Sequence, residues 1–138
     1  MGGTYGGNPV ACAAAHAAIS VIQEENLCQR SAEIGEHMLQ RLRQMKARDD
    51  LPPIGDVRGV GAMVAFELVK SPGGNEPDPE RAAALTAKTL EHGLVLLACG
   101  YWGNTIRLLA PLTIPENHLI EGLDIIERSL AEIAAKTS

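Results

Sequence analysis

The spacing of apolar residues along the chain switches between the period of a helix and the period of a strand. Apolar positions three or four residues apart, with charged and polar residues between them, predict helices over residues 26–47 and 116–135. The apolar stripe is expected to comprise Leu27, Ser31, Ile34, Met38, Leu42 and Met45 in the first helix, and Leu119, Leu123, Ile126, Leu130 and Ile133 in the second. Each helix therefore has one face that must pack against another element.

Shorter segments with alternating side chains predict strands between these helices. Residues 54–69 form a glycine-punctuated strand region, in which one face carries Val64, Phe66 and Leu68 and the other carries Met63, Ala65, Glu67 and Val69. Two further short strands are expected over residues 94–98 and 105–109, joined as a hairpin by a longer loop. This order of elements predicts an α+β fold, with a small antiparallel sheet covered by helices on one face.

Two further helices are marked by a capping residue followed by proline. Asn8-Pro9 precedes an alanine-rich run over residues 10–19, and Asp78-Pro79 precedes a helix that is expected to end near Gly93. The run over residues 10–19 is apolar almost all round, so a helix there is expected to be covered on most sides. In a chain of 138 residues this indicates that some of its packing partners are missing.

Composition narrows the class of function. A net charge of -5 and only four aromatic residues argue against a nucleic-acid surface. No apolar run approaches the ~20 residues that span a bilayer, and the glycine-rich start does not resemble a secretory signal. The three widely spaced cysteines indicate free thiols in a reducing cytoplasm, without a metal site or disulfides. Basic residues between Arg41 and Arg48 are interpreted as a solvated helix face.

The glycine-rich segment over residues 2–8 is the first candidate binding site. Glycines let backbone N–H groups approach an anion, the Thr4 hydroxyl can donate to phosphate, and a helix begins directly afterwards. The segment lacks the Gly-Lys-Ser/Thr ending of a nucleotide-binding loop. The residues alone leave a phosphate site and a simple turn equally open. Elsewhere, Gly59 and Gly61 lack the third glycine of a dinucleotide fingerprint and predict a turn entering a strand.

Arg107 is the second candidate, because it stands alone in the apolar segment over residues 106–112. A guanidinium presents two parallel donors that match a carboxylate, and no acidic residue is near in sequence. Binding of a substrate carboxylate, a structural ion pair and exposure at a strand edge remain open. The four histidines show no metal-binding or triad spacing, so no catalytic or metal-binding residue is predicted.

Taken together, three segments resemble the class-III, or omega-amino-acid, aminotransferases, which depend on pyridoxal phosphate. They are GTYGGNPVAC over residues 3–12, DVRGVGAM over residues 56–63 and GYWGNTIRLLAPLT over residues 100–113, in the family's order and spacing. The last is most similar to the 4-aminobutyrate and 5-aminovalerate enzymes. The resemblance implies a fold-type-I enzyme, with residues 26–138 as its C-terminal small domain. Residues 1–25 then form a glycine-rich loop and interdomain helix at the end of the large domain.

The resemblance also implies roles for single residues. Thr4 matches a threonine that reaches the pyridoxal phosphate of a neighbouring subunit, which implies a homo-oligomer. Arg107 matches the arginine that binds the α-carboxylate of glutamate or 2-oxoglutarate. The implied reaction moves an amino group from 4-aminobutyrate, or a similar omega-amino acid, to 2-oxoglutarate.

The family's cofactor-binding lysine precedes the Thr4 segment and has no counterpart here. The lysines of this sequence are Lys46, Lys70, Lys88 and Lys136. A lysine amine is needed to hold the cofactor, so the chain alone is expected to be an inactive part of a longer enzyme. Two other hypotheses are a module that self-associates through residues 10–19, and a carboxylate sensor built around Arg107.

Overall fold

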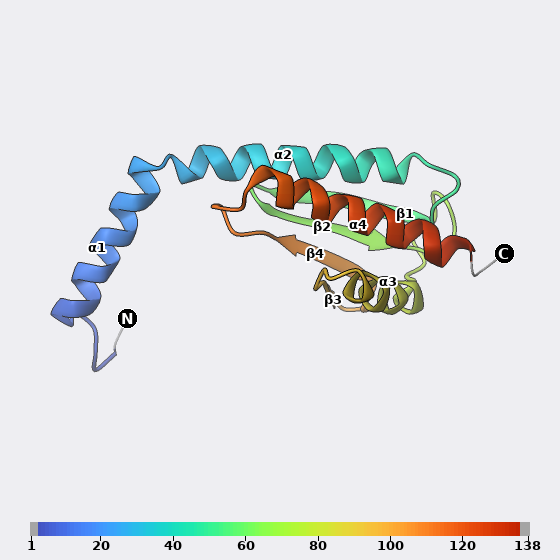
Figure 1. Ribbon diagram of the computed structural model, residues 1–138. Helices are drawn as coiled ribbons and strands as arrows, with labels where there is room; N and C mark the ends of the chain where they lie inside the picture. Colours follow the sequence, from blue (N-terminus) through green and yellow to red (C-terminus); the bar gives the residue numbers. More distant parts are fainter. Residues whose placement is uncertain (1–2, 136–138) are drawn as a thin grey trace.

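A computed structural model describes residues 3–135, which form four helices and one four-stranded antiparallel sheet (Figure 1). In chain order the elements are α1 (Pro9–Glu24), α2 (Leu27–Lys46), β1 (Ile54–Val60), β2 (Met63–Leu68), α3 (Pro79–Glu91), β3 (Leu97–Cys99), β4 (Thr105–Leu109) and α4 (Glu116–Ala135). The strands follow the order β1-β2-β4-β3. Helices α2 and α4 cover one face of the sheet, and α3 packs against α4 beside β3 and β4. The expected α+β fold is therefore confirmed.

One hydrophobic core fills the space between the sheet and these three helices. The strands contribute Val64, Phe66 and Leu68 from β2, and Ile106 and Leu108 from β4. The predicted stripe of α4 is buried along its whole length. In α2 the buried stripe begins at Ile34, whereas Leu27 and Ser31 are only half-buried because α2 extends past the sheet. Burial of each large apolar side chain contributes about 1.5–3 kcal/mol to the stability of the fold. The helix and strand periods of the sequence identify the residues that form this core.

The strand region over residues 54–69 is a hairpin of two strands. Gly61 makes the turn with φ +54°, a conformation that glycine adopts without strain. Gly61 thus serves the expected turn entering a strand, whereas Gly59 lies within β1, paired with Val64. The prediction that Val69 shares the outer face with Met63 is wrong. The chain leaves the sheet after Leu68, where the Val69 N–H donates to Pro53 at 3.1 Å, and the Val69 side chain is buried.

The segment between α3 and β4 confirms the predicted hairpin but shortens its first strand. Helix α3 starts at Pro79, with the Asp78 carboxylate accepting from the Arg81 N–H at 2.9 Å, and Gly93 follows it with φ +86°. The Leu94 N–H then donates to the Thr89 carbonyl at 2.8 Å. Because this bond ties residue 94 to the end of α3, pairing with β4 begins only at Leu97.

Arg41 in α2 and Arg48, just after the end of this helix, form ion pairs with α4. The interpretation of residues 41–48 as a solvated face is therefore wrong for these two arginines. Arg41 donates to Asp124 and Glu127, both at 2.8 Å. Arg48 pairs with Glu127 and, at 2.6 Å, with Asp50. These carboxylates on α4, 79 to 86 positions away in sequence, come within reach only because α4 packs beside α2.

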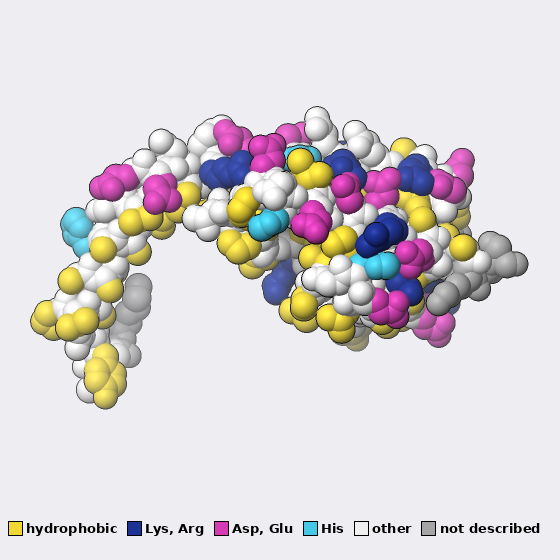
Figure 2. Space-filling model, in the orientation of Figure 1, with side chains coloured by type: hydrophobic (Ala, Val, Ile, Leu, Met, Phe, Trp, Pro, Cys, Tyr) yellow, Lys and Arg dark blue, Asp and Glu magenta, His cyan; other side chains and the backbone are white. Residues whose placement is uncertain are grey.

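Helix α1 projects away from the sheet and buries none of its residues (Figure 1). The Asn8 side chain caps it, accepting from the N–H groups of Val10 at 3.0 Å and Ala11 at 3.2 Å. Asn26, with φ +51°, separates α1 from α2. Apolar side chains line α1 in the space-filling view (Figure 2), and Val10 and Ile19 are 78% and 56% exposed. The described part of the chain therefore supplies no cover for this helix.

Within residues 3–135 no helix is both long and apolar enough to cross a membrane. The same residues contain no group of three or more His, Cys, Asp and Glu side chains placed to hold a metal ion. Cys12, Cys28 and Cys99 are free thiols.

Candidate functional site

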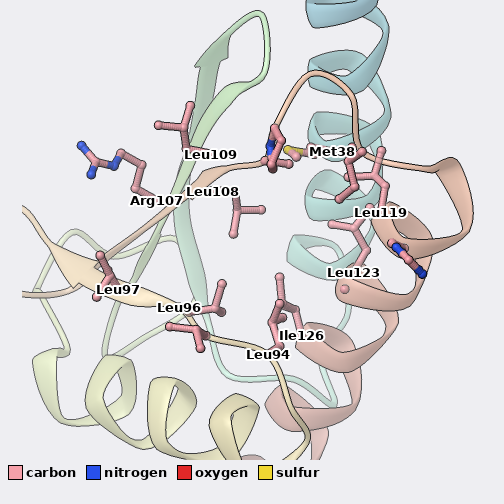
Figure 3. Close-up of a pocket in the computed structure, with 16 residues that line it drawn as sticks. Met38, Leu94, Leu96, Leu97, Arg107, Leu108, Leu109, Leu119, Leu123 and Ile126 are labelled. Carbon is pink, nitrogen blue, oxygen red and sulfur yellow. The ribbon is translucent and has the colours of Figure 1, made fainter.

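The uncovered face of the sheet carries two arginines in one cross-strand row. Arg58 of β1 and Arg107 of β4 lie opposite Ala65 of β2, on its two sides, and Leu97 of β3 lies opposite Arg107. Residues directly opposite each other in an antiparallel sheet project from the same face. Figure 3 shows Arg107 and Leu97 on the side of the sheet that faces away from α2 and α4.

Arg58 is already paired with two carboxylates. It contacts Asp56 at 2.8 Å and Glu67 at 2.7 Å. The hydrogen bonds that Arg58 donates to Asp56, and then to Glu67, raise the pKa of Arg58 above its ordinary value. We call Asp56, Arg58 and Glu67 the β1–β2 charge cluster. No sequence motif marks this cluster, although the alternation that puts Glu67 on the same face as Met63 and Ala65 indicates its place on the outer face.

Arg107, in contrast, has no hydrogen-bond or ion-pair partner among residues 3–135, and its side chain is exposed. Strand β4 lies between β2 and β3, so Arg107 is not at a strand edge. The pleat explains how an apolar strand accommodates this charge, because Ile106 and Leu108 face the core while Arg107 faces out. A structural ion pair and an edge position are thus excluded within the described chain.

The surroundings of Arg107 on this face are apolar. Ala65 is small, and Leu97 and Leu109 are 64% and 59% exposed. An unpaired guanidinium beside apolar residues presents two N–H donors, and the carboxylate diagonal to it, Glu67, is already paired with Arg58. Chemically, this arrangement can bind one carboxylate in a bidentate manner. The residues directly opposite it, Ala65 and Leu97, supply no nucleophile or general base.

An apolar cavity of about 460 Å³ is lined by the same hairpin together with residues of α2 and α4 (Figure 3). Its lining is hydrophobic apart from Arg107 and His118, and includes Leu94, Leu96 and Leu119. Leu94 and Leu96 point toward the helices, away from the Arg107 guanidinium. Apart from Arg107 and His118, the cavity offers only apolar packing surface.

Thr4 lies in an exposed turn before α1, at the end of that helix remote from the sheet (Figure 1). Gly2 of the same motif lies outside the described residues. Inside the turn, the Gly6 N–H donates to the Gly3 carbonyl at 2.9 Å. Asn8 already occupies the free N–H groups of Val10 and Ala11, so an anion bound here would rely on the Thr4 hydroxyl and the turn. The structure does not bring Thr4 and Arg107 together within one chain.

The described lysines make ion pairs or hydrogen bonds elsewhere. Lys46 donates to the Gly55 carbonyl, Lys70 pairs with Glu76, and Lys88 pairs with Glu91. The Glu76 carboxylate raises the pKa of Lys70, and the Glu91 carboxylate raises the pKa of Lys88. A raised pKa keeps an amine protonated, and a protonated amine cannot attack an aldehyde. Lys136 lies outside the described residues.

Comparison with known proteins assigns the family. The family described as "Aminotransferase class-III" matches residues 1–130, so the chain belongs to the class-III aminotransferases, a pyridoxal-phosphate-dependent family. It is 51% identical to the 4-aminobutyrate aminotransferase of Mycobacterium leprae over 132 residues, which are 96% of this chain and 29% of that protein. It is 46% identical to a 5-aminovalerate aminotransferase of Pseudomonas putida, covering 97% of this chain and 31% of that protein.

The fold comparison agrees. A transaminase from the marine bacterium Virgibacillus superposes with a TM-score of 0.85 at 30% identity, covering 100% of this chain and 32% of that one. The matching part is the C-terminal third of class-III transaminase structures. This chain thus spans about three tenths of the length of the curated relatives that it matches.

The described residues suit the phosphate group of pyridoxal phosphate but not its aldehyde group. An exposed turn with the Thr4 hydroxyl suits the phosphate. The aldehyde requires a neutral lysine amine, and the described lysines are ion-paired or hydrogen-bonded to the backbone. The chemistry of the donor set therefore supports a phosphate contact and no covalent attachment by these lysines.

Proposed function

We propose that this chain is the substrate-carboxylate-binding portion of a transaminase that moves an amino group from 4-aminobutyrate, or a similar omega-amino acid, to 2-oxoglutarate. The printed functions of the relatives at 51% and 46% identity support this reaction. In this role residues 26–138 are the small domain. Residues 1–25 provide the glycine-rich turn and an interdomain helix at the end of the large domain.

Arg107 binds the α-carboxylate of 2-oxoglutarate or glutamate. The observation that carries this assignment is the contrast between two arginines in one row of the sheet. Arg58 is paired with two carboxylates, whereas Arg107 has no partner among the described residues. The apolar neighbours Ala65 and Leu97 leave an incoming carboxylate as the natural counter-charge.

Thr4 contacts the phosphate of a pyridoxal phosphate bound by a neighbouring subunit. The position of Thr4 at the far end of α1 supports this, because one chain does not place Thr4 beside its own Arg107 (Figure 1). When bound, the cofactor supplies the electron sink for amino transfer. The residues of this chain bind the phosphate and orient the carboxylate. The working enzyme is therefore a homo-oligomer.

The proposal is tested by exchanging the matching third of the Mycobacterium leprae 4-aminobutyrate aminotransferase for this chain. In that chimera, Arg107→Ala should raise KM for 2-oxoglutarate about ten- to a hundred-fold, the factor expected for a charge-assisted hydrogen bond of about 1.5–3 kcal/mol. KM for the amino donor should stay unchanged, because its carboxylate is recognised outside this chain. Arg43→Ala, on the exposed side of α2, is the matched control. An unchanged KM for 2-oxoglutarate in Arg107→Ala contradicts the proposal.

The 138-residue chain by itself has no transaminase activity in this proposal, because its lysines do not hold the cofactor. The test is incubation with pyridoxal phosphate, reduction with borohydride and peptide mass spectrometry. The expected result is no stoichiometric adduct on any lysine and no amino transfer from 4-aminobutyrate. A stoichiometric adduct on Lys46, Lys70, Lys88 or Lys136, together with turnover, contradicts it.

A second candidate function is self-association through α1. The exposure of Val10 and Ile19 on a helix without buried residues favours it. Sedimentation velocity over a wide concentration range should then show a larger species that Ile19→Glu dissociates. A monomer at every concentration argues against self-association and leaves the assignment of Arg107 intact.

A further inference from the structure

Glu67 lies between the two arginines of the open face. Arg58 and Arg107 are both directly opposite Ala65, and Glu67 stands two positions further along β2 on the same face. Glu67 is therefore a diagonal neighbour of each arginine. Diagonal neighbours in an antiparallel sheet are about 7–8 Å apart, a distance that long side chains span. One carboxylate can thus reach either guanidinium.

The structure shows which arginine Glu67 contacts. The Glu67 Oε1 atom is 2.7 Å from Arg58 Nη2, and no ion pair joins Glu67 to Arg107 among residues 3–135. Asp56, which pairs with the other Nη atom of Arg58, holds that guanidinium on the β1 side of Glu67. If Arg58 were removed, Glu67 would lie near Asp56 without a counter-charge, and repulsion between the two carboxylates would favour its movement to Arg107.

We propose that Arg58 is a positioning residue that holds Glu67 away from Arg107 and so keeps Arg107 free to bind the substrate carboxylate. This inference rests on the proposed role of Arg107. In addition, it makes the affinity of Arg107 for a carboxylate depend on the ion pair between Arg58 and Glu67. Glu67 acts as an internal competitor for Arg107, and the β1–β2 charge cluster suppresses that competition.

The experiment uses the 138-residue chain with arginine side chains labelled with ¹⁵N and glutarate as the probe. The Nε–H signal of Arg107 is assigned by its loss in Arg107→Lys. In the wild type this signal should shift with glutarate while the Arg58 signal does not. In Arg58→Met the Arg107 signal should be displaced before any glutarate is added. The Kd for glutarate should rise about two- to five-fold, as expected for a diagonal ion pair of about 0.5–1 kcal/mol.

Three variants separate positioning from a general effect. Arg58→Met combined with Glu67→Gln should restore both the free Arg107 signal and the wild-type Kd, because the competing charge is gone. Arg58→Lys, which keeps the cation, should behave like the wild type. Lys70→Met removes one positive charge from a more exposed pair, with Glu76, and should change neither readout. Unchanged amide spectra outside the sheet show that each variant is folded.

The outcomes distinguish this inference from the proposed function. If Arg107 responds to glutarate in the wild type and Arg58→Met leaves both its signal and the Kd unchanged, the inference is overturned and the proposed function stands. If the loss in Arg58→Met is not reversed by Glu67→Gln, the inference is likewise overturned. If Arg107 does not respond to glutarate in the wild type, the assignment of Arg107 as the carboxylate site fails.

Discussion

Gly35, in the middle of α2, lies directly against the carbonyl of Gly61 in the β1–β2 turn. A Cβ atom added at Gly35 would be 2.0 Å from that oxygen. One turn earlier on the helix, Ser31 Oγ accepts a hydrogen bond from the Ala62 N–H at 2.9 Å. These two contacts fix α2 on the hairpin that carries Arg58, and they set the direction in which α2 continues toward α1.

We expect Gly35→Ala to destabilise the chain by about 1–3 kcal/mol, because the new methyl group meets rigid backbone and the helix must shift. The gain in helix propensity, about 1 kcal/mol, offsets only part of this. Urea unfolding followed by circular dichroism measures the change. Gly122→Ala in α4 is the control, since its nearest neighbour, Leu94 Cδ1, would lie at 3.8 Å. Equal effects of the two substitutions would disprove the close contact.

We expect Asn8→Ala to fray α1 without changing the midpoint of global unfolding. The substitution removes the acceptor of the Val10 and Ala11 N–H groups, a loss of about 1 kcal/mol for an N-cap. Because α1 buries none of its residues, that loss stays local. Amide hydrogen exchange should accelerate in α1 and not in α4. Gln23→Ala, an exposed substitution at the other end of α1, is the comparison.

Arg41→Met should lower the free energy of unfolding by about 1 kcal/mol. Arg41 donates to Asp124 and Glu127, and the partial exposure of these groups limits what the pairs contribute. Arg43→Met, exposed on the same helix, should change stability by no more than about 0.5 kcal/mol. A double-mutant cycle with Glu127→Gln measures the coupling energy between Arg41 and Glu127. A coupling energy of zero would contradict a stabilising ion pair between α2 and α4.

The carboxylate of Asp50 should titrate below its ordinary pKa of 3.8, because Arg48 donates a hydrogen bond to it. A folded-state pKa that is lowered contributes stability above the unfolded value, and that contribution is lost as the pH falls through the folded value. The pH window for this group therefore lies below 3.8. NMR titration of the Asp50 side chain measures the pKa, which should rise in Arg48→Met. A pKa that is insensitive to Arg48 contradicts the expectation.

Local signals in the sequence were sufficient for most of the elements. The Asn8-Pro9 and Asp78-Pro79 pairs mark the starts of α1 and α3, because a side-chain acceptor and a fixed φ act within a few residues. The apolar stripe of α4 is buried as its period predicts. The predicted strand boundaries are wrong where a backbone hydrogen bond outside the sheet competes with strand pairing. Val69 bonds to Pro53 instead of continuing the strand, and Leu94 bonds to the end of α3.

The sequence by itself determined the family, the order of the elements and the faces of the strands, because motifs, caps and side-chain periods act over short stretches of chain. Only the tertiary structure decided that Arg58 and Arg107 share a row across Ala65, that one is paired while the other is free, and that Glu67 lies between them. The register between strands depends on packing of β1, β2 and β4 against a common core. No local pattern specifies which residues that packing brings opposite each other.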